Sequence, residues 1–121
     1  MFLPGSVYNV QKNEYSFEWY TDYMYYKKFY HNLKEEEVVA SVRKDGFNPI
    51  KIVDEAGYEY RPHAHPESKL LVFLKGSMTV RFLGEEYQCE PGDKVVIPGN
   101  IEHSATTGPE GCEFLWSEKM L

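Results

Sequence analysis

The stretch that decides the fold runs Gly57-Tyr58-Glu59-Tyr60-Arg61-Pro62-His63-Ala64-His65. Its aromatic content is typical of a β-strand, in which side chains two residues apart lie on the same face. His63 and His65 are therefore predicted to direct their imidazoles toward one point. Neutral imidazole is a good ligand for divalent transition metals. A third histidine, His103, follows a second strand bounded by glycine and proline, so the sequence predicts a metal pocket inside a small β-barrel.

From residue 47 onward, apolar residues recur with a period of two, which indicates strands. Met78, Val80 and Phe82, for example, alternate with Thr79 and Arg81. We predict strands over 47–54, 57–63, 69–75, 77–83, 85–90, 94–97, 102–106 and 112–117. Turns containing glycine or proline separate them at 75–76, 83–84, 91–93, 98–100 and 108–111. Many short strands with such turns indicate an all-β sandwich or barrel.

The segment before the predicted strands has a different composition. Residues 1–32 form an aromatic-rich arm whose residues suit either helix or strand, and whose rings are expected to pack on the barrel or on a partner subunit. Residues 33–45 are predicted to be a short helix, because glutamates fill its first turn and basic residues its last. Gly46 fits the position that ends it. We therefore divide the chain into an arm and helix (1–46) and a barrel (47–121).

Composition excludes several classes of partner. The 121 residues suit one domain, and a net charge of −6 with a pI near 5.2 argues against nucleic acid, which needs a basic face. No apolar run is long enough to span a membrane, and the first residues lack the pattern of a secretory signal, so we expect a cytoplasmic protein. Cys89 and Cys112 are expected to be free thiols.

Two linked motifs resemble those of the cupin superfamily. In the first, five residues separate Gly57 from His63, one separates His63 from His65, and Gly76 closes the motif. In the second, Gly92, Pro98 and His103 keep the family spacing. The resemblance covers roughly residues 47–117. It implies a double-stranded β-helix, or jelly-roll, barrel, a divalent metal held by His63, His65 and His103, and a homodimer.

The metal itself is not fixed by three histidines. Zinc is the default by affinity, and iron, manganese, nickel and copper remain open. Three imidazoles leave room for water or substrate, as in catalytic zinc sites.

The chain departs from the cupin pattern at three positions. The family's glutamate ligand would stand at position 69 or 70, where this chain has Lys69 and Leu70; Asn100 and Thr107 replace a glycine and an asparagine. Unit positive charges about 4 Å apart repel by about 4 kcal/mol at an effective dielectric near 20, and a divalent ion roughly doubles this.

This repulsion leaves four interpretations of Lys69. It swings outward to pair with Glu67 or Glu59, it loses its proton beside the metal, it orients an anionic substrate, or it replaces the ion in a metal-free pocket.

Strand parity yields further candidates for the pocket. Arg61 shares the parity of the histidines, whereas Tyr58 and Tyr60 are predicted to point to the opposite face. Glu67 is a weak candidate for a fourth ligand, because Pro66 bends the chain before it. The apolar residues expected in the core or the pocket wall are Phe73, Phe82, Ile97 and Trp116.

Three functions fit this pattern. The first is a metal-dependent enzyme of dioxygenase, isomerase or decarboxylase type acting on a small polar or anionic molecule, with Lys69 orienting the substrate. The second is a non-catalytic cupin that binds or senses a small molecule. The third is a storage or structural protein with a vestigial site. The sequence does not name the substrate or the reaction.

Overall fold

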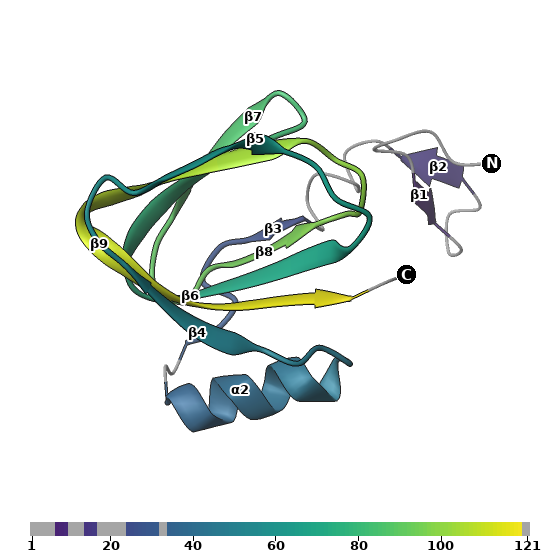
Figure 1. The fold of residues 1–121 in the computed structure, drawn as a ribbon. Helices are drawn as coiled ribbons and strands as arrows, with labels where there is room; N and C mark the ends of the chain where they lie inside the picture. The colour runs from purple at the N-terminus through teal and green to yellow at the C-terminus, as the bar shows by residue number, and fades with distance from the viewer. Residues whose placement is uncertain (1–6, 10–13, 17–23, 32–33, 120–121) are drawn as a thin grey trace.

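The computed structural model describes residues 7–9, 14–16, 24–31 and 34–119 (Figure 1). Its elements are β1 (Val7–Asn9), β2 (Glu14–Ser16), β3 (Tyr25–Tyr26), α2 (Glu35–Lys44), β4 (Ile50–Asp54), β5 (Glu59–His63), β6 (Ser68–Phe82), β7 (Glu85–Cys89), β8 (Lys94–Ile97) and β9 (His103–Lys119). Among these residues, no helix is long and apolar enough to cross a membrane.

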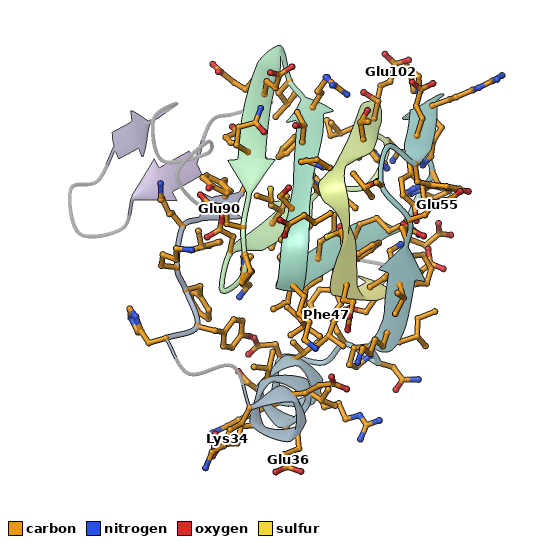
Figure 2. The ribbon with its side chains drawn as sticks, turned by 90° about the vertical axis from the view of Figure 1, so that its left-hand side faces the viewer. Lys34, Glu36, Phe47, Glu55, Glu90 and Glu102 are labelled. Atoms are coloured by element: carbon orange, nitrogen blue, oxygen red, sulfur yellow. The ribbon has the colours of Figure 1, made fainter. Side chains whose placement is uncertain are left out.

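The short helix α2 confirms the prediction for residues 33–45. Its first turn is acidic and its last turn basic, which complements the helix macrodipole. Gly46 follows with a φ of +93°, a conformation that glycine adopts without strain. Val38 and Val42 are buried against the barrel, while Lys34 and Glu36 project from the solvent side (Figure 2).

Two long strands build the barrel, where the sequence predicted four short ones. The turns expected at 75–76 and 108–111 are bends within β6 and β9. The register between the strands shifts on both sides of this point, and Gly76 and Gly111 adopt positive φ angles of 72° and 77°. A Cβ on Gly76 would lie 2.1 Å from the Gly111 carbonyl oxygen, so this close approach requires glycine.

Because β6 and β9 bend, each contributes to both walls of the barrel. The first half of β6 lies between β8 and the end of β9, and β3 and β4 extend this wall in the order β3-β8-β6-β9-β4. The second half of β6 pairs with β7 and with the start of β9, which in turn pairs with β5. All these pairings are antiparallel, and the strands curl around a common interior (Figure 1). The fold is therefore the all-β jelly-roll barrel that the sequence predicted.

The core has two parts because α2 covers the outside of one wall. The interior cluster includes Phe73, Phe82 and Ile97, three of the expected core residues, together with the two free thiols. The second cluster packs Val38 and Val42 against Leu70, Val72, Leu74 and Leu115. A strand buried on both faces does not alternate, which explains the continuous apolar run from Leu70 to Leu74.

The described parts of the aromatic-rich arm contain three short strands and the turn residues around β3. β1 pairs with β2, and β3 extends the barrel wall by pairing with β8. Asp93 anchors this segment: its carboxylate accepts hydrogen bonds from the Lys28 amide (2.8 Å), the Glu90 amide (2.9 Å) and the Tyr25 hydroxyl (3.0 Å). Residues 1–6, 10–13, 17–23 and 32–33 of the arm lie outside the described part.

Candidate metal centre

Three histidines from two segments meet at one end of the barrel cavity, where His63 is exposed and His65 is half-buried. His63 ends β5, His65 follows two residues later, and His103 begins β9 directly opposite His63 in the register. Their ring centroids lie 4.4 to 5.3 Å apart, and one ligand atom from each lies within 4.8 Å of the others. This is the convergence that the spacing of the histidines predicted.

The hydrogen bonds of these histidines leave the same nitrogen free on each ring. The Nδ1 atoms of His63, His65 and His103 contact the backbone carbonyl oxygens of Arg61 (2.5 Å), Glu67 (3.3 Å) and Ile101 (2.9 Å). A carbonyl oxygen can only accept, so each Nδ1 carries a proton, and in the neutral imidazole Nε2 then keeps a lone pair. Such carbonyl contacts fix the tautomer and orientation of metal-binding histidines.

Two further observations fit a metal at this point. His65 Nε2 is buried and has no hydrogen-bond partner among the described residues, which is costly unless a ligand satisfies it. The pKa of His103 is lowered, chiefly by burial and further by the charges of His63, His65 and Lys69, and is partly restored by its hydrogen bond to Ile101. A lowered pKa keeps this imidazole neutral, as metal binding requires. The donor set suits a divalent transition metal.

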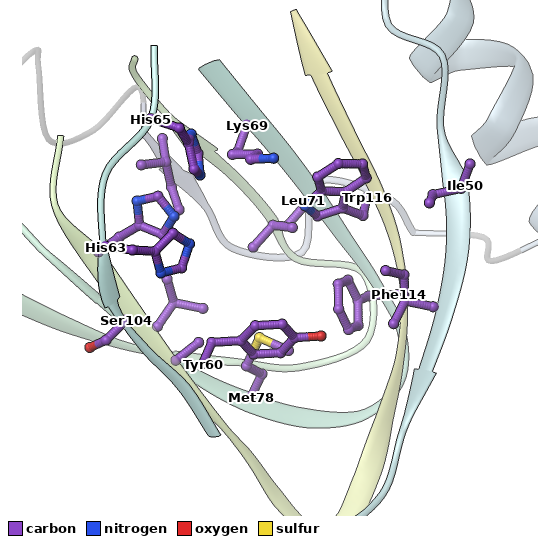
Figure 3. Close-up of a pocket in the computed structure, with 15 residues that line it drawn as sticks. Ile50, Tyr60, His63, His65, Lys69, Leu71, Met78, Ser104, Phe114 and Trp116 are labelled. Carbon is purple, nitrogen blue, oxygen red and sulfur yellow. The ribbon is translucent and has the colours of Figure 1, made fainter. Parts of the chain in front are cut away.

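The histidines line one end of a cavity of about 390 Å³. In Figure 3, His63 and His65 stand on one side, Phe114 and Trp116 on the other, and Lys69 between them. The remaining wall is mainly apolar and is formed by Ile50, Ile52, Tyr60, Leu71, Met78, Val80, Ile97, His103, Ser104 and Ala105. Of the expected wall residues, Ile97 and Trp116 line the cavity.

Lys69 lies in this cavity but turns away from the histidines. Its Nζ is 2.6 Å from Glu118 Oε2 and 3.8 Å from the centroid of the Trp116 ring (Figure 3). The partner is therefore Glu118, the cross-strand neighbour of Lys69, and neither Glu67 nor Glu59. The negative charge of Glu118 offsets the repulsion between the Lys69 ammonium and a metal ion at the histidines.

Strand parity was wrong for β5. The register shifts between Tyr60 and His63, so β5 has one more residue than β9 across this interval. This bulge places Tyr60 on the cavity wall with the histidines, while Arg61 is exposed. Burial and a hydrogen bond to Asp54 (2.5 Å) raise the pKa of Tyr60, so its hydroxyl keeps its proton.

Glu67 does not join the three histidines in the group of potential ligands. Its carboxylate lies 3.9 Å from His65 Nδ1, which is the protonated side of that ring. The sequence offered no signal for Glu118, because the predicted strand ended at residue 117. Extending it by one residue gives Glu118 the parity of Trp116.

Known proteins resemble this chain in both sequence and fold. The family model of the AraC-like ligand binding domain matches residues 51–118. Dimethylsulfoniopropionate lyase DddW of Ruegeria pomeroyi is 35% identical over 60 residues, which are 50% of this chain and 40% of that protein. The chain thus matches less than half the length of this relative.

Solved structures of other proteins share the fold of this chain. An RmlC-like cupin from Shewanella frigidimarina is 25% identical with a TM-score of 0.55, over 60% of this chain and 64% of that one. A variant of the oxalate decarboxylase of B. subtilis is 23% identical with a TM-score of 0.55, over 65% of this chain and 23% of that one. The second similarity concerns the fold alone.

Proposed function

The chain belongs to the AraC-like ligand-binding domain family and to the cupin superfamily, and from this premise we propose that it is a metal-dependent enzyme acting on a small molecule with an anionic group. His63, His65 and His103 hold a divalent transition metal. When bound, this ion supplies a Lewis acid that polarises an oxygen of the substrate.

One observation carries this proposal: all three Nδ1 atoms are braced by backbone carbonyls, and the buried Nε2 of His65 is left without a partner among the described residues. In a histidine cluster with a purely structural role, both nitrogens of each buried ring would form hydrogen bonds, because a buried polar atom without a partner destabilises the fold. The sequence similarity to a lyase acting on dimethylsulfoniopropionate supports elimination or decarboxylation chemistry on an organic acid.

The other polar residues of the cavity have distinct roles in this proposal. Lys69 orients the anionic group of the substrate. Tyr60 keeps its proton and donates it to Asp54, so its hydroxyl oxygen can accept a hydrogen bond at the cavity wall. The apolar wall excludes water, which strengthens the electrostatic interactions at the histidine end.

Elemental analysis tests the metal site. Protein purified without chelator or affinity tag should carry one zinc, iron, manganese or nickel ion per chain, and His103→Ala should lose it. His31→Ala is the matched control, because His31 is exposed and lies outside the cavity. Equal metal content in wild type and in His103→Ala would refute the proposal.

A second function, non-catalytic ligand binding or sensing, is favoured by the family match to a ligand-binding domain. Tight binding of an organic acid without turnover by the metal-loaded protein would support it. Under either function, we propose that the chain forms a homodimer in which the arm and helix (residues 1–46) pack on the barrel or on the partner. Sedimentation of the full chain tests the dimer.

A further inference from the structure

The ion pair of Lys69 and Glu118 is asymmetric in its burial. The Lys69 side chain is 9% exposed, whereas the Glu118 side chain is 38% exposed. The ammonium is therefore enclosed by the barrel, with the Trp116 ring beneath it, and its carboxylate partner approaches from the solvent side. Glu118 lies one residue before the end of β9. Of the two groups, Glu118 is the one that can leave, because it regains water on doing so.

The cavity that Lys69 lines is polar on one side and apolar on the other. Lys69 provides a positive charge and the histidines provide Nε2 lone pairs on one side, and the wall beyond them is built mainly from aliphatic and aromatic side chains. A dianion or a sugar extending from Lys69 along Leu71, Phe114 and Trp116 would place its further polar groups against an apolar wall, which is unfavourable. A molecule with one anionic head group and an apolar body matches both sides.

We propose that Glu118 is an internal substitute for the anionic group of the ligand, and that the ligand is a monocarboxylate with an apolar body which displaces Glu118 from Lys69. This inference rests on the proposed function, in that the cavity is the small-molecule site. The carboxylate of the ligand takes the position of the Glu118 carboxylate beside Lys69 Nζ, and its body lies along Leu71, Phe114 and Trp116. Glu118 then acts as a specificity residue, since a neutral molecule cannot replace it.

A purely structural ion pair behaves differently when its two members are changed. If the pair only fastens β6 to β9, removing either charge has the same direction of effect on every property. If Glu118 competes with the ligand, removing Glu118 strengthens carboxylate binding and removing Lys69 weakens it. The change in carboxylate affinity therefore has opposite signs in the two variants only if Glu118 competes with the ligand.

The test uses calorimetric titration of the full chain with hexanoate, octanoate and phenylacetate, and with hexanamide as the neutral probe. Each titration is made on protein as purified and on protein dialysed against chelator. We expect Glu118→Gln to bind the carboxylates about tenfold more tightly than wild type, the scale of one charge-assisted hydrogen bond, and Lys69→Met about tenfold more weakly. Hexanamide should bind these proteins alike. Glu35→Gln is the matched control, because it removes a carboxylate from the exposed Lys51 pair outside the cavity.

Thermal unfolding gives a second readout that does not need tight binding. Glu118→Gln leaves an enclosed ammonium without its carboxylate, so its melting temperature should fall, and hexanoate should raise it by more than it raises that of wild type. Weaker carboxylate binding by Glu118→Gln, equal binding by all variants, or no carboxylate binding by any protein would overturn the proposal. Metal content is measured separately. If the protein holds no metal, the titrations of chelator-dialysed protein still test whether a carboxylate displaces Glu118 from Lys69.

Discussion

The Asp93 carboxylate and His65 Nε2 are both buried polar groups, yet they differ in whether they have hydrogen-bond partners. The Asp93 carboxylate is fully buried and accepts three hydrogen bonds from backbone and side-chain donors. His65 Nε2 is also buried, but no donor or acceptor among the described residues reaches it. A satisfied buried group holds structure together, whereas an unsatisfied one beside converging ligand atoms in a cavity marks a place that a ligand completes. This difference distinguishes the region around Asp93, which anchors β3, from the histidine end of the cavity, which is the candidate metal site.

The largest effect is expected from Asp93→Ala. It removes the buried carboxylate that accepts three partly buried hydrogen bonds, and it should lower the free energy of unfolding by about 3 kcal/mol. Asp93→Asn keeps one acceptor and the side-chain shape, so it should lose less. Urea denaturation followed by circular dichroism measures both variants. A loss below about 1 kcal/mol for Asp93→Ala would remove the contrast between the two regions.

The histidine end should show the reverse behaviour. His103→Ala should change the stability of the metal-free protein by less than Asp93→Ala does, because its ring hydrogen bond goes to one carbonyl at the cavity. It should abolish the stabilisation by added zinc, which for wild type amounts to about 2.7 kcal/mol at a free concentration of about 100 times Kd. Thermal unfolding with and without zinc measures this, with His31→Ala as control. Stabilisation of His103→Ala by zinc would contradict the assignment.

Sequence reasoning found the histidine end because its signal is local. His63 and His65 are two residues apart, and His103 belongs to the second of two spaced motifs, so family spacing and strand geometry identify all three. The helix and most strand positions followed from charge placement and alternation in the same way.

The remaining features depend on pairing between distant segments. The bulge in β5 reverses the predicted side of Tyr60, and no single-strand pattern contains that extra residue. The pairing of Lys69 with Glu118 joins residues 49 positions apart. The sequence around Gly76 and Gly111 predicts turns and the structure has bends, because a glycine that allows close strand packing has the same sequence signature as one that ends a strand. Each error arises where a tertiary contact overrides a local pattern.

The pH dependence of stability should distinguish the histidine end. The pKa of His103 is lowered in the folded protein, chiefly by burial, from an ordinary value near 6.5. As the pH falls below about 6.5, the unfolded chain therefore binds a proton at His103 before the folded protein does, and the free energy of unfolding decreases. We expect urea denaturation at pH 7.5 and at pH 5.5 to show a larger loss for the metal-free wild type than for His103→Gln. An equal loss would show that the burial of His103 does not affect its protonation.

The smallest effect is expected at Ser117, the other buried side-chain atom without a hydrogen-bond partner among the described residues. Ser117 pairs with Leu70 in the register and does not line the cavity, so nothing at this position resembles the converging donors around His65. Removing an unsatisfied buried hydroxyl recovers its desolvation cost, and Ser117→Ala should raise the free energy of unfolding by up to about 1 kcal/mol without changing metal content. The same denaturation experiment measures it. A clear loss of stability would mean that the hydroxyl has a partner, and the corresponding inference from the unpaired Nε2 of His65 would lose its support.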